Sequence, residues 1–209
     1  QNFISFFVFY ILPVGVLSCG WKPFLGQTFY RQIKYFNMQR ENYMLIIWDF
    51  DGVICDSDDI WAENWRKLLK SEKDIEISEQ EKRELLIGIS EKDKAKRLES
   101  HFSGLKIDDA FKKKLNELHD FGMKNLLVLT NGVDKIFADS RFKQCIATGG
   151  NQYQNDTKNH TVGIDKYFSK NNCFTADMVE KGKPNPDIFL LAAEKMQVSA
   201  SDCIIIEDS

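Results

Sequence analysis

Residues 45–52 read LIIWDFDG, a short apolar run that ends in two aspartates and a glycine. Four consecutive apolar residues predict a strand that is buried on both faces, as strands of parallel sheets are. The polar residues that follow then lie at the carboxyl end of the strand, where open α/β sheets bind ligands. The stretch therefore predicts an α/β fold with Asp49 and Asp51 at a functional edge of the sheet.

Two further apolar runs also end in polar residues. The run at 125–129 is followed by TNG, and the run at 203–206 is followed by EDS. If these strands are parallel to the first, one edge of the sheet gathers Asp49, Asp51, Thr130, Asn131, Glu207 and Asp208. Carboxylates held so close together repel one another, and a bound cation relieves that repulsion. Oxygen ligands without His or Cys favour Mg²⁺.

The segment between the first two expected strands is helical in pattern. Apolar residues recur at helical spacing within 61–69, and residues 78–81 read SEQE, the pattern of a capping box. Ser90 is expected to cap a third helix, and residues 111–119 form a fourth. We therefore predict a small all-helical domain at 59–120, inserted into the α/β domain.

The rest of the chain contains shorter elements. Residues 148–160 are polar and rich in Asn and Gly, which predicts a loop. A short strand is expected at 173–175, followed by an extended turn at 183–186, since each proline disfavours a helical conformation in the residue before it. A helix then begins at Asp187.

Four segments, in this order, resemble the motifs of the haloacid dehalogenase superfamily. They are DFDGV at 49–53, LTN at 129–131, GKPNPD at 182–187 and IEDS at 206–209. The resemblance covers residues 44–209. It is strongest to the subgroup with a helical cap between the first two motifs, which includes sugar-phosphate phosphatases and β-phosphoglucomutase.

This resemblance implies a Rossmann-like parallel-sheet core at 44–58 and 121–209, with the helical cap at 59–120. The apolar extension at 1–43 is expected to lie outside the fold. Members of the superfamily continue past the fourth motif with a helix and usually another strand. We therefore expect this chain to be truncated, with its core incomplete at the C-terminus.

The resemblance also implies an activity, the Mg²⁺-dependent hydrolysis of a phosphomonoester of a small metabolite, such as a sugar or polyol phosphate. Asp49 would attack phosphorus and form an aspartyl-phosphate. Asp51 would protonate the leaving oxygen and then activate water. Gly52 would permit the backbone path after the nucleophile.

The remaining motif residues would bind phosphate and metal. Thr130 and the amide of Asn131 would hold phosphate oxygens, and Lys183 would neutralise charge on the transferring group. The implied Mg²⁺ ligands are the Asp49 side chain, the Asp51 backbone carbonyl, Asp208, and Glu207 either directly or through water.

Two alternatives to the phosphatase stay open, a phosphomutase of the β-phosphoglucomutase type and an inactive fragment that acts only as a binding module. The cap departs from the mutase pattern. Trp61 follows Ser57 at the offset where the mutase has a histidine, and Ile87 and Glu91 stand where it has a lysine and an arginine. A bisphosphate intermediate needs a second cationic site, so these departures favour the phosphatase.

Composition restricts the partners and the compartment. The net charge is −3 and no long basic block occurs, so no nucleic-acid partner is expected. The five cysteines are scattered and form no CxxC pair, which predicts free thiols in a reducing compartment, the cytoplasm. Residues 3–17 are apolar but fall short of the about 20 residues that span a bilayer. Membrane contact is expected only if they form a signal or anchor.

Overall fold

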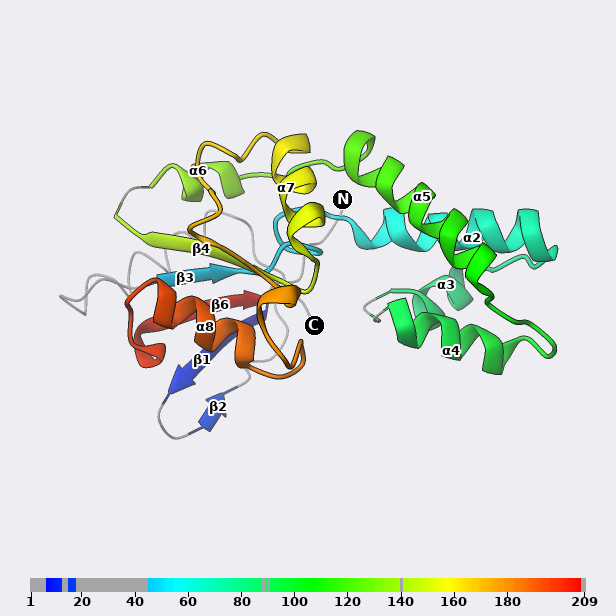
Figure 1. The fold of residues 1–209 in the computed structure, drawn as a ribbon, viewed down its shortest axis with the longest axis horizontal. Coiled ribbons are helices and arrows are strands. Elements are labelled where there is room, and N and C mark those ends of the chain that lie inside the picture. Colours follow the sequence, from blue (N-terminus) through cyan, green and yellow to red (C-terminus); the bar gives the residue numbers. More distant parts are fainter. Residues whose placement is uncertain are drawn as a thin grey trace. The chain divides into compact units, whose positions relative to one another are not determined.

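The computed structural model places the chain in two compact units, Asp56–Leu127 and the combination of Gln1–Cys55 with Val128–Ser209 (Figure 1). The structure describes residues 7–12, 15–17, 45–87, 89, 91–139 and 141–207. The cap predicted at 59–120 lies within the first of these units.

The larger unit is built on one sheet with strand order β2-β1-β6-β3-β4-β5. The strands are β1 (Phe7–Leu12), β2 (Gly15–Leu17), β3 (Leu45–Trp48), β4 (Lys143–Thr148), β5 (Cys173–Thr175) and β6 (Cys203–Glu207). The last four strands are parallel, whereas β1 pairs antiparallel with β6 and with β2. The sequence predicts an extension outside the fold at 1–43; in the structure, two segments of this stretch pair at the edge of the sheet.

The parallel strands are buried because helices cover both of their faces. Alternate residues of a strand point to opposite faces. One face contributes Leu45 and Ile47 of β3 to a core that is covered by α8 (Asp187–Lys195). On the other face the ring of Trp48 packs edge-on against Phe137 of α6 (Val133–Phe137) at 5.2 Å. The predicted α/β fold with a parallel-sheet core is confirmed.

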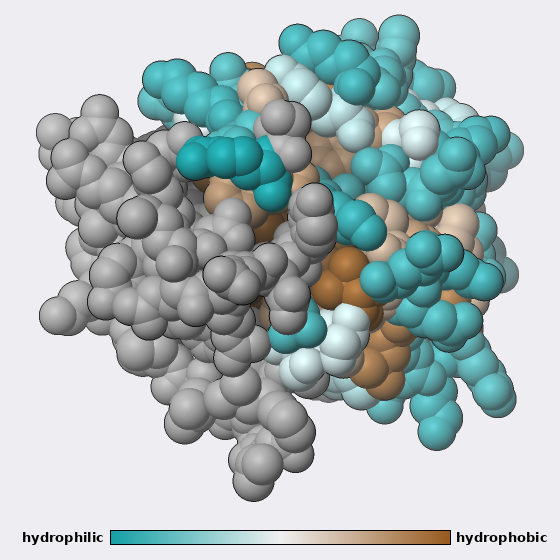
Figure 2. Space-filling view, turned by 90° about the vertical axis from the view of Figure 1, so that its left-hand side faces the viewer, coloured by the Kyte–Doolittle hydropathy of each residue, from teal (hydrophilic) through white to brown (hydrophobic). Residues whose placement is uncertain are grey.

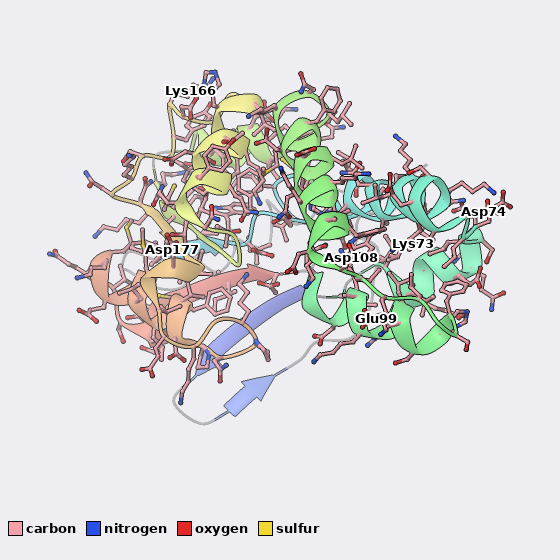
Figure 3. All side chains as sticks on the ribbon, turned by 45° about the vertical axis from the view of Figure 1, so that its right-hand side comes forward. Lys73, Asp74, Glu99, Asp108, Lys166 and Asp177 are labelled. Atoms are coloured by element: carbon pink, nitrogen blue, oxygen red, sulfur yellow. The ribbon has the colours of Figure 1, made fainter. Side chains whose placement is uncertain are left out.

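The smaller unit is entirely helical in its described residues. It comprises α2 (Asp58–Lys73), α3 (Glu79–Leu85), α4 (Glu91–His101) and α5 (Asp109–Asn125). The predicted capping box is present, since Ser78 and Glu81 exchange side-chain and backbone hydrogen bonds at the start of α3. Lys73, at the end of α2, lies 3.6 Å from Asp108, the N-cap of α5 (Figure 3). Ser90, the predicted cap of α4, lies outside the described residues.

Eleven buried apolar side chains hold this helical unit together. Trp65 of α2 and Phe111 of α5 lie with their ring centroids 5.6 Å apart in the middle of this core. Fully burying an aromatic or aliphatic side chain contributes roughly 1.5–3 kcal/mol. The apolar residues at helical spacing thus form a core within this unit, and the assignment of residues 59–120 as an inserted cap stays a prediction.

The strand predicted at 125–129 is wrong. Helix α5 continues to Asn125, and of the residues that follow only Leu129 makes a β-bridge, an isolated one with Cys55. No neighbouring strand buries the run, and Val128 is 73% exposed. Apolar composition alone predicted a strand where the chain passes from one unit to the other.

The loop predicted at 148–160 is also wrong. Strand β4 ends at Thr148, and α7 (Gln152–Thr161) follows after three residues. Asn151 and Gln154 form a capping box in which each side chain accepts a hydrogen bond from the other residue's backbone N–H. The polar composition of this stretch favoured a loop prediction. The helix is indicated only by its capping box, Asn-x-x-Gln, which is less familiar than Ser-x-x-Glu.

Two short 3-10 helices, η1 (Ala176–Met178) and η2 (Ala200–Asp202), complete the described elements. On the face shown in Figure 2, hydrophilic side chains predominate among the coloured residues and hydrophobic ones form small patches. Within the described part of the chain, none of the helices has the length and apolar character needed to span a membrane.

Candidate active site

Three of the predicted site residues meet at the carboxyl end of the central strands. Asp49 directly follows β3, and its N–H donates to Ile206 of β6, so that the sheet ladder continues up to this residue. Lys183 lies between two carboxylates, with its Nζ 2.8 Å from Asp49 Oδ1 and 2.7 Å from Glu207 Oε2. Glu207 is the last residue of β6. The structure thus brings Asp49, Lys183 and Glu207 together.

Burial and charge perturb this cluster strongly. Burial, reinforced by the charges of Glu207 and Asp51 and opposed by Lys183, raises the pKa of Asp49 to about 8. Burial acts to lower the pKa of Lys183, but the carboxylates of Asp49 and Glu207 outweigh it and raise that pKa. A buried carboxyl among other carboxyls is therefore held in place by one ammonium group.

The raised pKa of Asp49 predicts a pH-dependent stability. Between the unfolded pKa of 3.8 and the folded value of about 8, the native state binds a proton that the unfolded state has released. The free energy of unfolding of the metal-free protein should then fall as pH rises through this window. Asp49→Asn removes the cost of ionising a buried carboxyl. At pH 8 this variant should be more stable than the wild type by roughly 1–3 kcal/mol.

Urea unfolding in EDTA at pH 5 and pH 8 measures this difference. Asp134→Asn, which removes an exposed carboxylate of α6, is the control and should change stability little at either pH. Equal stability of Asp49→Asn and the wild type at both pH values would contradict the assignment of a perturbed Asp49.

Asp51 lies in a tight turn beside this cluster. Its Oδ2 is 2.6 Å from Nζ of Lys158, a residue of α7. Gly52, which follows, has a φ of 75°, in the left-handed region that favours glycine, and its N–H donates to Cys55. The predicted backbone requirement at Gly52 is therefore present, whereas Lys158 was not anticipated from the sequence.

Thr130 and Asn131 do not lie at the end of a sheet strand as predicted. The N–H of Thr130 donates to the carbonyl of Ile54 at 2.8 Å, which places Thr130 beside the loop that follows Asp51. Thr130 is buried and its Oγ1 has no hydrogen-bond partner among the described residues, while Asn131 is exposed. Their role as phosphate ligands stays a prediction.

In place of Thr130, the structure puts the hydroxyl residue Thr148, the last residue of β4, at the carboxyl edge of the sheet. It closes β4, whose Ile146 pairs with Trp48 of β3, and it is fully buried. Its Oγ1 accepts a hydrogen bond from the N–H of Gly150 at 3.2 Å. The signal that could have found it is the run CIAT at 145–148, an apolar strand that ends in a hydroxyl residue before two glycines.

The oxygen donors at this edge fit a hard divalent ion by their chemistry. Asp49 and Glu207 are buried carboxylates close enough to raise the pKa of Asp49, and a cation would relieve that repulsion. Within the part of the chain that the structure describes, no three side chains of His, Cys, Asp or Glu are grouped as a metal site. The predicted ligand Asp208 lies outside that part.

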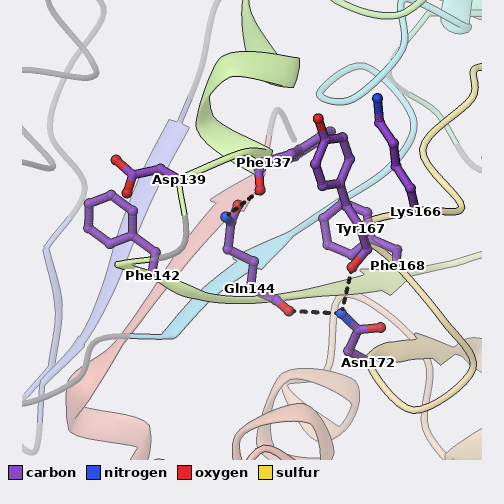
Figure 4. Close-up of a pocket in the computed structure, with 8 residues that line it drawn as sticks. All are labelled: Phe137, Asp139, Phe142, Gln144, Lys166, Tyr167, Phe168 and Asn172. Atoms are coloured by element: carbon purple, nitrogen blue, oxygen red, sulfur yellow. Dashed lines mark hydrogen bonds between the residues drawn. The ribbon is translucent and has the colours of Figure 1, made fainter.

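A pocket of about 310 Å³ lies elsewhere, at the amino ends of β4 and β5 (Figure 4). Phe137, Tyr167 and Phe168 supply aromatic walls. Inside it, the side-chain amide of Asn172 donates to the backbone carbonyls of Gln144 and Tyr167. It lies at the opposite end of the strands from Asp49 and is not the candidate active site.

Comparison with known proteins now identifies the family. The family model described as haloacid dehalogenase-like hydrolase matches residues 43–209. The chain belongs to this family. The predicted resemblance to the haloacid dehalogenase superfamily is therefore confirmed, and with it the assignment of the chain as an enzyme of the hydrolase class.

Relatives of this haloacid dehalogenase-like hydrolase cover most of the chain. It is 27% identical over 170 residues to the phosphorylated carbohydrates phosphatase of Thermotoga maritima, covering 78% of this chain and 76% of the relative. A haloacid dehalogenase-like protein of Agrobacterium tumefaciens has a TM-score of 0.68 at 27% identity, covering 78% of this chain and 72% of that one. A putative β-phosphoglucomutase of Thermotoga maritima has a TM-score of 0.63 at 25% identity, covering 78% and 74%.

Proposed function

We propose that this chain is a Mg²⁺-dependent phosphatase that hydrolyses phosphomonoesters of small sugars or polyols. The observation that carries the proposal is the buried Asp49 at the end of the central strand, held 2.8 Å from Lys183, with Asp51 in the adjoining turn. The carbohydrate class of substrate is supported by the relative from Thermotoga maritima, which is named as a phosphatase of phosphorylated carbohydrates.

In the first step, an Asp49 oxygen forms a bond to phosphorus while the bond from phosphorus to the ester oxygen breaks. Asp51 gives a proton to the departing oxygen, so that the sugar leaves as a neutral alcohol. Lys183 neutralises negative charge that develops beside Asp49. Bound at the carboxylates, Mg²⁺ would supply positive charge to the phosphoryl oxygens.

In the second step, a water oxygen attacks the phosphorus of the aspartyl-phosphate. Asp51, now ionised, takes a proton from that water, and the bond between Asp49 and phosphorus breaks. Inorganic phosphate leaves and Asp51 is again protonated. The two carboxyls thus have separate proposed roles, nucleophile and acid/base, and the pairing of each with a different lysine supports this division.

A phosphomutase is the second candidate, because a solved structure named as a putative β-phosphoglucomutase is similar to this chain. The cap argues against it. Glu91 accepts hydrogen bonds from Trp65 at 2.8 Å and from Lys94 at 2.6 Å. Burial acts to raise its pKa, but His119 and Lys94 outweigh burial and lower the pKa of Glu91 to about 2. An anion therefore stands where the mutase resemblance calls for a cation.

A screen of phosphate release separates these candidates. The purified protein is incubated with Mg²⁺ and a panel of hexose, pentose and polyol phosphates, with p-nitrophenyl phosphate as a general probe. Phosphate release from sugar or polyol esters supports the phosphatase. An isomerised sugar phosphate without release favours the mutase, and no turnover by a folded protein favours an inert binding module.

Asp51→Asn should slow hydrolysis of sugar phosphates by ~10²–10⁴-fold, because it removes general acid/base catalysis but keeps the nucleophile. Hydrolysis of the aspartyl-phosphate also needs the base, so the intermediate should accumulate with p-nitrophenyl phosphate. Mass spectrometry of the peptide that holds Asp49 should then show one added phosphate. Asp56→Asn, which changes an exposed carboxylate nearby, should keep normal kinetics. Normal turnover by Asp51→Asn would remove Asp51 from the mechanism.

Removal of divalent ions should abolish turnover. Dialysis against EDTA leaves the carboxylate cluster without its proposed cation, and added Mg²⁺ should restore the rate. Mg²⁺ should also raise the thermal unfolding midpoint of the wild type, because a ligand that binds only the native state stabilises it. This shift should disappear in Asp49→Asn. Full activity after exhaustive chelation would refute the metal dependence.

We also assign the enzyme to the cytoplasm. The four cysteines of the described residues, Cys55, Cys145, Cys173 and Cys203, are buried and free, which suits a reducing compartment. A small phosphate ester is the partner that this proposal requires.

A further inference from the structure

The buried face of α7 is polar, which is unusual for a helix packed against a sheet. Asn155, Lys158 and Asn159 are spaced three and four residues apart, so they lie on one side of the helix. All three are buried. Such a face is normally apolar, because burying polar groups costs free energy unless they are paired. The structure therefore points to a role other than packing for at least one of them.

Lys158 is the member of this face that contacts the proposed site. Its side chain is 3% exposed, and its Nζ lies 2.6 Å from Asp51 Oδ2. The same Nζ lies over the ring of Phe50, 4.6 Å from the centroid. Both contacts are made to the turn that follows β3, although Lys158 is 107 residues away in the sequence. A single buried ammonium thus joins α7 to the turn that carries the proposed acid/base.

The two lysines of the site divide the carboxylates between them. Lys183 contacts Asp49 and Glu207, whereas Lys158 contacts Asp51. The side chain of Asp51 is 31% exposed, and the residue directly precedes the tight turn at 52–54. An ion pair to a nearly immobile ammonium restricts the rotation of this side chain and fixes where the carboxylate points.

We propose that Lys158 is a positioning residue that orients the Asp51 side chain, which as a carboxylic acid gives its proton to the leaving oxygen and as a carboxylate takes a proton from the hydrolytic water. The inference rests on the proposed phosphatase function and deepens it. Lys158 need not touch the substrate, because it acts through Asp51. Displacing a reacting group by about 1 Å can cost ~10²-fold in rate.

The dependence on the leaving group tests this role. Lys158→Met keeps most of the length of the side chain but removes the charge. It should lower kcat/KM for the best hexose phosphate of the screen by about 10–100-fold, because that alkoxide needs a proton to leave. It should lower kcat/KM for p-nitrophenyl phosphate by less than about 3-fold, because p-nitrophenolate leaves without one. Lys158→Arg, which restores the cation, should recover most of the loss.

A double-mutant cycle identifies the partner. In an Asp51→Asn background, Lys158→Met should have no further effect on the hexose phosphate, since the group it orients is already lost. Equal losses for both esters, or a full loss that persists in the Asp51→Asn background, would overturn the proposal. A wild type without phosphatase activity would instead refute the proposed function itself.

Lys94→Met is the control for removing a buried lysine. Lys94 is equally buried and pairs with Glu91 at the same distance of 2.6 Å, but it belongs to the helical unit. Any loss in this variant should be the same for the two esters. If Lys158→Met fails to fold by circular dichroism, Lys158→Gln replaces it, because a neutral amide suits a polar buried face but is shorter than lysine and removes the ammonium that contacts Asp51. The same dependence on the leaving group is then expected.

Discussion

Asp49→Asn is expected to abolish phosphate release from every ester in the screen. The amide keeps the size of the carboxyl, but it cannot form the acyl-phosphate and it removes a negative charge from the proposed metal site. Loss of a nucleophile typically costs at least ~10⁴-fold in turnover. Among the described acidic residues, Asp49 combines burial at the end of the central parallel strand with contact to Lys183, whose side chain is 20% exposed.

The measurement is phosphate release at saturating substrate, together with a search for the phosphorylated peptide. Asp49→Asn should yield neither product nor a phosphate adduct. Its fold should be intact, and its higher stability at pH 8 would show that lost activity does not come from unfolding. Near-normal hydrolysis by Asp49→Asn would falsify the aspartyl-phosphate scheme, because Asp51 is already assigned to proton transfer.

The parts of the fold that the sequence predicted correctly are those in which a strand is buried on both faces. LIIW at 45–48 and CIII at 203–206 are continuous apolar runs because helices cover both sides of these strands. The polar residues after each run follow from the same cause, since the carboxyl ends of parallel strands lie at one edge. The pattern alone therefore predicts that Asp49 and Glu207 lie at the same edge of the sheet.

The sequence did not predict β4, because this strand is less apolar than the run at 125–129, which is not a strand. NLLVL at 125–129 is the more hydrophobic sequence, but it links the two units and leaves Val128 exposed. The true neighbour of β3 is β4, which begins with Lys143 and Gln144. Both of these polar residues lie at the amino end of the strand, where Gln144 bonds to Trp48 and to carbonyls of α6. Which of the two runs becomes a strand depends on its tertiary contacts, and a local sequence pattern does not show these contacts.

Lys158 could not be predicted for a related reason. It lies in a polar stretch whose pattern indicates no buried face, and only the packing of α7 brings it to Asp51. Lys183, by contrast, sits in a motif next to prolines that can be read directly. The sequence therefore located the proposed nucleophile, Asp49, and its partner Lys183, but it did not locate Lys158, which contacts the proposed acid/base.

Lys183→Met is expected to have the second largest effect. Lys183 bridges two buried carboxylates, so its removal leaves Asp49 and Glu207 facing each other without a counter-charge. Removing one partner of a buried ion pair typically costs about 3–5 kcal/mol of stability. Loss of a cation that stabilises developing charge also costs ~10²–10³-fold in kcat. Lys183→Met should thus be both less stable and much slower than the wild type.

A second substitution separates these two effects. In Lys183→Met combined with Glu207→Gln, one of the unpaired charges is gone, so a large part of the lost stability should return, as measured by urea unfolding at pH 8 in EDTA. Turnover should not return, because the cation proposed to neutralise charge on the phosphoryl group is still absent. Lys181→Met, an exposed lysine in the same loop, is the matched control and should change neither property. Recovery of both turnover and stability in the double variant would show that Lys183 only stabilises the fold. Wild-type kinetics in Lys183→Met alone would exclude Lys183 from the active site.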